Sequence, residues 1–426
     1  MSSINLENLT IPKSTNCRFL LSACPELESV TLPKNATIIH SLIFDGCYNL
    51  KNVDIPDTVT TIGFCAFQDC GIESITLPDT ITSISFGAFE CCDNLESIVL
   101  SNKIEEISDK AFYECKKLKS ITLPSSLTTI GEEAFGKCTD LESITIPDSV
   151  TIIDEGAFKG CTKLKNITLS SSLTTISKEA FCNCTELESI IIPDSVISID
   201  EAAFKGCTKL KNIILPSLLT AIGSEAFSNC ISLESINIPD GVISIRRRAF
   251  ENCTSLKSIK IPDSVKNIDS YAFDGCKKLK DITIPNSVTL IDMCVFENCE
   301  SLEHIKLPDS IDNIYNNTFA GCSSLEYITI PDAVKSIGSY AFSECKSLEN
   351  LEIPYGVTDI GFMAFYNCKN LKNITIPTSL NYISSYAFSE CESLETVTII
   401  SDCTSKIIDV RELDLDTMDQ WIFLYF

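Results

Sequence analysis

Apolar and polar positions along the chain repeat with a period of 23 residues. The unit reads C-x-x-L-x-x-I-x-[IL]-P-x-x-[VL]-x-x-I-x-x-x-A-F-x-x, as in the stretch from Cys161 to Cys184. Its cysteine returns 17 times between Cys24 and Cys391, at intervals of 23 residues except for one of 22 residues that ends at Cys92. Self-similarity at a period of about 20–50 residues indicates a solenoid or a related array.

Each unit is expected to hold two short apolar segments that face a common core. The first segment ends in alternating apolar residues, such as Ile144 and Ile146, which is typical of a half-buried strand. Pro147 ends this strand because proline has no N–H group to continue the ladder. The second segment turns inward again up to the Ala-Phe pair that ends at Phe158, and Cys161 closes the coil as a small buried hydrophobe.

A single unit of this length cannot bury its own apolar face, whereas stacked units share one continuous core. Phenylalanine stands three places before the repeated cysteine in 16 of the 17 units, and Leu21 takes that place in the first. We therefore predict a β-rich solenoid with a stacked aromatic spine. It is a right-handed coil of about 17 units, with parallel stacked strands, short strands or turns on the second side, and atypical ends.

The two ends of the chain depart from the repeat, as capping units of a solenoid must. Residues 1–24 are predicted to form a shortened capping unit, residues 25–407 the solenoid, and residues 408–426 a C-terminal cap or tail. No linker rich in glycine, serine or proline interrupts the repeats, which favours one continuous architecture. The acidic last segment, DVRELDLDTMDQWIFLYF, is expected to form a capping helix, with a remnant of a truncated anchor as the alternative.

The repeat resembles the BspA-type leucine-rich repeat proteins, whose 23-residue units are also called the Treponema pallidum class. The resemblance covers about residues 6–407 and keeps its register throughout. It implies a leucine-rich-repeat solenoid on a microbial surface, an adhesin or antigen that binds host or extracellular-matrix proteins. The competing interpretation is an intracellular scaffold or regulator built on the same array.

The charge and hydropathy of the chain narrow its partners. An excess of 58 Asp and Glu over 33 Lys and Arg repels phosphate backbones, so nucleic acid is not expected as a partner. No apolar run approaches the roughly 20 residues of a membrane-spanning helix, so no transmembrane segment is expected. The first residues, MSSINLENLTIPK, lack the basic and apolar regions of a secretory signal, so we expect a cytoplasmic chain, an unrecognised export route or a removed leader.

The residues needed for common catalytic and metal sites are missing from the pattern. The two histidines, His40 and His304, lie far apart in the array, which argues against a histidine-based triad or metal set. Carboxylates are plentiful but periodic. We therefore expect a non-enzymatic chain without a cofactor or metal. Most of the 23 cysteines form one ladder of parallel side chains, a poor geometry for disulfides, and abundant free thiols favour a reducing compartment.

A charge ladder follows the first leucine of each unit, because the next residue is always Glu or Lys and neighbouring units differ in sign in 12 of 16 steps. Such a ladder is mainly structural. One acidic run, formed by Glu303, Glu326 and Glu349 beside Lys306 and Glu352, breaks the alternation. We hypothesise that this run is a patch for a protein or glycoprotein partner.

The stretch SIRRRAFENC places three of the five arginines of the chain, Arg246, Arg247 and Arg248, in a predicted surface turn. Two interpretations remain open. The arginines neutralise acidic turns on flanking units, such as Glu225 and Asp269, or they form a basic docking spot for an anionic partner or glycan.

Two further surfaces are candidates for recognition. Threonine stands between the two strand isoleucines in nine units, which suits a solvent-facing strand and makes this face the favoured recognition surface. Aromatic residues in the turns are either contact residues or covers for apolar units; the tyrosines among them are Tyr271, Tyr340 and Tyr386.

Overall fold

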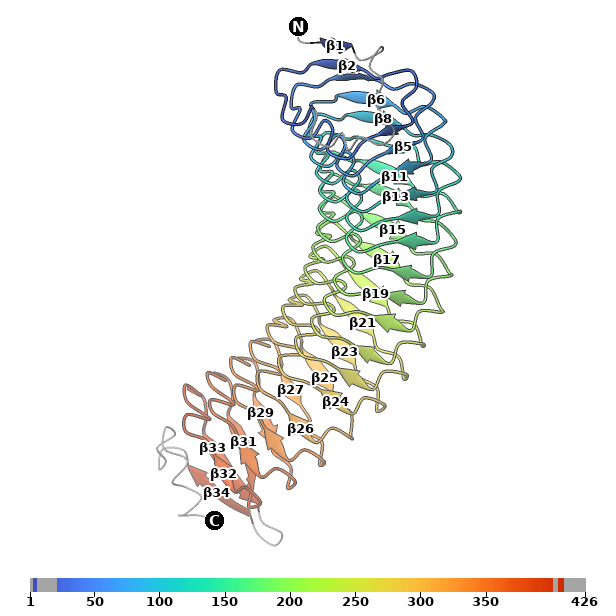
Figure 1. The fold of residues 1–426 in the computed structure, drawn as a ribbon. Coiled ribbons are helices and arrows are strands. Elements are labelled where there is room, and N and C mark those ends of the chain that lie inside the picture. Colours follow the sequence, from blue (N-terminus) through green and yellow to red (C-terminus); the bar gives the residue numbers. More distant parts are fainter. Residues whose placement is uncertain (1–2, 6–20, 401–404, 410–426) are drawn as a thin grey trace. The chain divides into compact units, whose positions relative to one another are not determined.

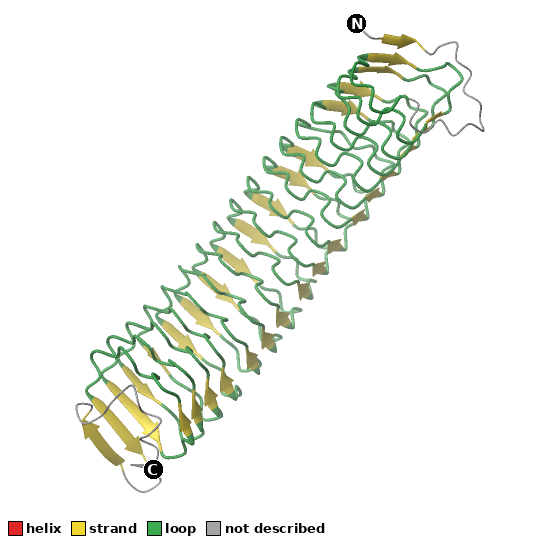
Figure 2. Ribbon diagram, turned by 60° about the vertical axis from the view of Figure 1, so that its left-hand side comes forward, coloured by secondary structure: helices red, strands yellow, loops and turns green. Residues whose placement is uncertain are grey.

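The structure is a computed structural model, and it describes residues 3–5, 21–400 and 405–409 of the chain. The chain divides into two compact units, Met1–Pro216 and Ser217–Phe426. The described residues of both units form strands and turns, without a helix (Figure 2). A coil is one 23-residue repeat, and it carries a first-side strand before the proline position and a second-side strand after it (Figure 1).

The first unit contains strands β1 to β17 without gaps in their order. Its first-side strands are β1 (Ser3–Asn5), β2 (Ser29–Thr31), β4 (Asn52–Asp54), β6 (Ser74–Thr76), β8 (Ser97–Val99), β11 (Ser143–Thr145), β13 (Asn166–Thr168), β15 (Ser189–Ile191) and β17 (Asn212–Ile214). Its second-side strands are β3 (Ile38–Ile39), β5 (Thr61–Ile62), β7 (Ser83–Ile84), β9 (Glu106–Ile107), β10 (Thr129–Ile130), β12 (Ile152–Ile153), β14 (Thr175–Ile176) and β16 (Ser198–Ile199).

The second unit contains the remaining strands, β18 to β34. Its first-side strands are β19 (Ser235–Asn237), β21 (Ser258–Lys260), β23 (Asp281–Thr283), β25 (His304–Lys306), β27 (Tyr327–Ile328), β29 (Asn350–Glu352), β31 (Asn373–Pro377) and β33 (Thr396–Ile400), followed by β34 (Ser405–Asp409). Its second-side strands are β18 (Ala221–Ile222), β20 (Ser244–Ile245), β22 (Asn267–Ile268), β24 (Leu290–Ile291), β26 (Asn313–Ile314), β28 (Ser336–Ile337), β30 (Asp359–Ile360) and β32 (Tyr382–Ile383).

Strand pairing within each unit follows the repeat. Partners in neighbouring coils are parallel and one repeat apart, as for Ile144 and Ile167 in the first unit and Ile282 and Ile305 in the second. The central isoleucine of a first-side strand is buried and the residues on either side of it face solvent. The predicted β-rich solenoid with parallel stacked strands is therefore confirmed.

The described residues depart from the predicted pattern in three places. The 22-residue interval places Gly71 where a Cβ atom would lie 2.1 Å from the carbonyl oxygen of Tyr48, so only glycine fits. The expected strand around Ile121 does not form, and beside it the hydrogen bond from Lys119 N–H to the Glu96 carbonyl lengthens to 3.4 Å. Strand β34 runs antiparallel to β33 and covers its edge, which the repeat does not predict.

The predicted ends of the chain lie mostly outside the described residues. Of the capping unit predicted for residues 1–24, strand β1 pairs in parallel with β2. The helix predicted for the acidic last segment falls on residues that the structure does not describe, apart from Asp409 at the end of β34.

The predicted aromatic spine is present in both units. The spine phenylalanines, which stand three places before the repeated cysteines, are completely buried from Phe44 to Phe204 and from Phe227 to Phe388. Successive rings stack, with centroids 5.5 Å apart between Phe135 and Phe158 and 5.6 Å apart between Phe250 and Phe273. Offset stacking adds to the burial of such large side chains, so the spine is a principal source of cohesion between coils.

The repeated cysteine does more than fill space, because its thiol is a hydrogen-bond donor. The Cys161 thiol donates to the carbonyl oxygen of Phe135 in the preceding coil, with 3.1 Å between sulfur and oxygen. The same oxygen accepts the backbone N–H of Cys138, and Phe135 N–H donates to the Ala157 carbonyl of the next coil. Burial raises the pKa of Cys161 well above its ordinary value, so the thiol keeps the proton that it donates.

We predict that replacing a repeated cysteine weakens the stack. Cys161→Ala removes a buried thiol donor and leaves a small cavity, so the free energy of unfolding should fall by about 1–2 kcal/mol. Cys91→Ala is the matched control, because Cys91 is a half-buried turn residue outside the ladder. Chemical denaturation of both variants measures the difference, and equal losses would contradict a hydrogen-bonding role of the ladder.

Candidate functional site

The first-side strands expose two columns of side chains, one from the first and one from the third residue of each strand. The first residue is Ser or Asn in 13 of the 17 coils, and the third is Thr in nine. These residues are small, polar and interchangeable. A coil that departs from them therefore does so for a reason other than the stacking of strands.

Three consecutive coils of the second unit depart from the first column. They carry Asp281, His304 and Tyr327, which are direct neighbours in the register of β23, β25 and β27. In the other column, Lys306 and Glu352 lie on either side of Thr329, on β25 and β29. We call these residues, from Asp281 to Glu352 on the first-side strands, the strand-face site.

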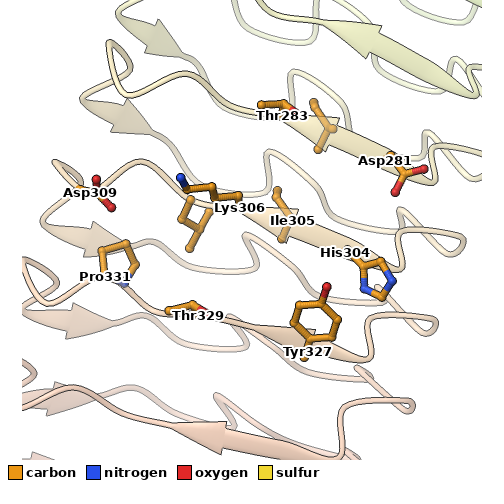
Figure 3. A pocket seen from close by; sticks show the side chains of 11 residues that line it. Asp281, Thr283, His304, Ile305, Lys306, Asp309, Tyr327, Thr329 and Pro331 are labelled. Carbon is orange, nitrogen blue, oxygen red and sulfur yellow. The ribbon is translucent and has the colours of Figure 1, made fainter.

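The strand-face site lines two hollows. One has a volume of about 460 Å³ and is lined by Asp281, His304, Lys306, Asp309 and Tyr327 among others (Figure 3). The other, of about 700 Å³, is lined on its first-side strands by residues of β27, β29, β31 and β33. Tyr327 and Thr329 line both, so the hollows are neighbours. Their volumes fall in the range of ligand pockets, about 300–1,000 Å³.

An aromatic pair stands between the hollows. The rings of His304 and Tyr327 stack with centroids 4.5 Å apart and planes inclined by 30°. Tyr327 nevertheless keeps 57% of its surface exposed, whereas Nδ1 of His304 is buried and has no hydrogen-bond partner among the described residues. A large, exposed and positioned aromatic side chain is typical of the centre of a binding surface.

The charges of the strand-face site are available to a partner. Asp281, Lys306 and Glu352 form no ion pair with any residue that the structure describes. Asp309 accepts a hydrogen bond from the side-chain amide of Asn286, at 3.1 Å. Exposed charges without a fixed partner lose little when they turn to a ligand.

The predicted acidic run is partly neutralised by the charge ladder. Glu303 pairs with Lys280 at 3.1 Å and Glu349 with Lys372 at 3.4 Å, whereas Glu326 has no ion pair within the described part of the chain. These glutamates precede the strands, and the predicted Lys306 and Glu352 lie on the strand face itself. A partner patch at the acidic run stays a prediction. Because lysines pair with Glu303 and Glu349, the predicted charges that remain on the strand face without an ion pair among the described residues are Lys306 and Glu352.

The three arginines lie in a turn, as expected, but they are not equivalent. Arg246 and Arg247 are exposed, whereas the guanidinium of Arg248 lies 4.9 Å from the ring centre of Tyr271 and its Nε lies 3.3 Å from Glu251. Burial raises the pKa of the Asp269 carboxyl, the neighbouring Asp292 adds to this, and the charge of Arg246 opposes it. This proximity supports the neutralising interpretation for Arg246, and a docking role for the triplet stays a prediction.

The predicted turn tyrosines lie in turns that correspond to the turn of the three arginines, and not on the strand face. Tyr340 and Tyr386 each pack edge-to-face on Phe362, at 5.6 and 6.0 Å between ring centres. Tyr271 is held by Arg248 and, on its other side, by Cys294. These packing contacts agree with a covering role for the tyrosines, and a contact role for them stays a prediction.

The repeat pattern did not predict Asp281 and Tyr327 as site residues, and His304 was considered only as an isolated histidine. The signal was present, because three successive coils lack the Ser or Asn of the first column. A second departure was also missed in the first unit, where Ile191 and Ile214 are neighbours across β15 and β17 and are 83% and 81% exposed.

Asp274 gives the turn region a pH-dependent contribution to stability. Burial, assisted by Glu297 and Glu251, raises its pKa to about 6 against an opposing effect of the Asn298 hydrogen bond. The folded state therefore holds this proton more tightly than the unfolded state. Its contribution to stability grows as pH falls from about 6 towards 3.8 and is lost as pH rises through the folded pKa.

We predict that Asp274→Asn raises the urea midpoint near neutral pH, because it removes a buried charge. The gain over the parent chain should shrink as pH falls from roughly 7.5 to roughly 4.5. Urea unfolding followed by circular dichroism at several pH values measures this. A gain that does not change with pH would show that the carboxyl keeps its ordinary pKa.

Within the described residues, no cluster of His, Cys, Asp and Glu could hold a metal ion, and no helix is long and apolar enough to cross a membrane. The strand-face site combines an exposed tyrosine stacked on a half-buried histidine, charges that form no ion pair with the described residues, and two hollows.

Comparison with known proteins gives consistent matches to repeat proteins. A family model described as "BspA type Leucine rich repeat region" matches residues 14–142, 128–257, 220–322, 244–354 and 312–407. A leucine-rich repeat protein from Bacteroides ovatus is similar at 33% identity, over 87% of this chain and 86% of that one, with a TM-score of 0.64. No curated protein matches the chain.

Two further solved structures are similar to parts of the chain. A leucine rich cell surface protein from Faecalibacterium prausnitzii shows 30% identity over 78% of this chain and 88% of that one, with a TM-score of 0.50. A leucine-rich repeat protein from Treponema pallidum shows 29% identity over 49% of this chain and 78% of that one, with a TM-score of 0.33.

Proposed function

The chain belongs to the BspA-type leucine-rich repeat family, and on that premise we propose that it is a non-enzymatic binding protein of a microbial cell surface, an adhesin or surface antigen. Its partner is a protein or glycoprotein of a host or of the extracellular matrix. The observation that carries the proposal is the strand-face site, where an aromatic pair and charges without an ion pair among the described residues replace the Ser, Asn and Thr of other coils. The similar Faecalibacterium protein, which is described as a cell surface protein, supports the location.

The geometry of the strand-face site fits recognition better than catalysis. Its aromatic, charged and hydroxyl side chains are spread over neighbouring strands and face outward, as a large partner requires. Tyr327 is the expected anchor, since exposed tyrosines contribute large contact area at low entropic cost. The unpaired charges around it orient the partner.

A second candidate, an intracellular scaffold or regulator, is favoured by one observation. All described cysteines are free thiols, which agrees with a reducing compartment. Most of them are buried with raised pKa values, however, and such thiols are inert in oxidising surroundings as well. Protease treatment of intact source cells separates the two candidates: loss of antibody labelling at the surface supports the adhesin, and labelling only after permeabilisation supports the scaffold.

We predict that the strand face carries the binding of matrix proteins. The full chain should bind at least one member of an immobilised panel of collagen, laminin and fibronectin. Tyr327→Ser and Lys306→Thr restore the usual residues of their columns, so they should fold and yet weaken binding at least tenfold each, about 1.4 kcal/mol.

The matched control for this prediction is Tyr382→Thr. Tyr382 is 51% exposed but lies on the second-side strand β32, so its loss should leave binding unchanged. Surface plasmon resonance gives the affinities. An unmodified chain that binds no panel member, or strand-face variants that bind as tightly as the parent, would refute the prediction.

A further inference from the structure

Tyr327 presents an aromatic face that the fold itself does not use. Its column holds small polar residues in most coils, and 57% of its surface remains exposed after stacking on His304. The register of β25 and β27 places the two rings beside each other, so their stacking fixes the phenol ring. A fixed aromatic ring is a platform for a flat apolar partner, and the C–H face of a pyranose ring is such a partner.

A row of hydrogen-bonded polar side chains lies in the coils that follow Tyr327. The Thr396 hydroxyl donates to the side-chain oxygen of Asn373 at 2.6 Å, and the Asn373 amide donates to the side-chain oxygen of Asn350 at 2.8 Å. Asn350 is the last residue of this hydrogen-bonded row and lies in the coil next to that of Tyr327. Its side-chain amide donates to no residue in the described part of the protein. It therefore offers N–H donors to a ligand that lies over Tyr327.

The charges around the hollows select against anionic ligands. Carboxylates of Asp281, Asp309, Asp332 and Glu352 line the hollows, and Lys306 is the one lysine or arginine among the lining residues. The chain as a whole has a formal net charge of −25. Sialylated or sulfated sugars would be repelled, whereas carboxylates accept hydrogen bonds readily from neutral sugar hydroxyls.

The spacing of the coils also matches a sugar chain. Neighbouring parallel strands lie about 4.8 Å apart, which is close to the advance per residue of an extended chain of pyranose rings. The two neighbouring hollows extend from β23 to β33. An oligosaccharide that lies across these strands would therefore meet one coil with each sugar residue.

We propose that the strand-face site binds a neutral oligosaccharide carried by a glycoprotein partner, with one pyranose ring stacked on Tyr327 and its hydroxyls bonded to Asn350 and the neighbouring carboxylates. This inference rests on the proposed binding function and names the chemical group that the site recognises. Glu352 lies one coil beyond Tyr327 and Asp281 lies two coils before it, so these carboxylates line the hollows on either side of the stacked sugar.

A glycan microarray tests the inference directly. The full chain is applied to neutral, sialylated and sulfated oligosaccharides, together with Tyr327→Phe, Tyr327→Ser and the control Tyr382→Thr. The expected result is binding to neutral glycans that Tyr327→Phe and Tyr382→Thr retain and that Tyr327→Ser weakens tenfold or more. Binding to anionic glycans alone, to none, or to neutral glycans with undiminished strength by Tyr327→Ser would overturn the inference.

A second arm separates this inference from the proposed function. Matrix glycoproteins that the chain binds are treated with a glycosidase that removes their N- and O-linked glycans, and binding is measured again. Loss of binding supports the inference. Binding that survives deglycosylation but still depends on Tyr327 overturns the inference that the site recognises a glycan, while the proposed protein-binding function stands. A chain that binds neutral glycans on the microarray but binds no matrix glycoprotein would overturn the glycoprotein source and the proposed partner.

Discussion

The carbonyl oxygen of the spine phenylalanine is the group on which the stacking of coils depends. In the coil of Phe135 it accepts the N–H of Cys138 from its own turn and the thiol of Cys161 from the next coil. Phe135 N–H in turn reaches the Ala157 carbonyl of that next coil. All these groups are buried, where an unmade hydrogen bond is costly. Phenylalanine and cysteine therefore stay constant while the exposed residues change.

This buried frame determines where function can reside. Because every coil repeats the same core, stability is a sum over coils and their interfaces, and a single coil can vary its exposed residues at small cost. The first and third residues of the first-side strands are the positions that face solvent and align from coil to coil. The strand-face site uses both columns, and its residues come from consecutive coils of one unit.

The sequence predicted most of the fold because the repeat itself expresses the physical constraints. The stacked phenylalanines, the strand that ends at a proline and the buried cysteine follow from the spacing. Strand β34 could not be predicted in this way, since it lies outside the repeat and pairs in the opposite direction. The hydrogen bond of the cysteine thiol was also hidden, because the spacing shows burial but not donor geometry.

The candidate site was predicted only in part. Lys306 and Glu352 were placed beside a presumed acidic run, but the run loses Glu303 and Glu349 to lysines of flanking coils. The stacking of His304 on Tyr327 depends on side-chain conformations that a repeat pattern does not determine.

One variant, His304→Ser with Lys306→Thr and Tyr327→Ser, tests whether these departures serve recognition and not the stability of the stacked coils. Its free energy of unfolding should equal or exceed that of the parent chain, whereas a loss of several kcal/mol would show that the three residues stabilise the stack.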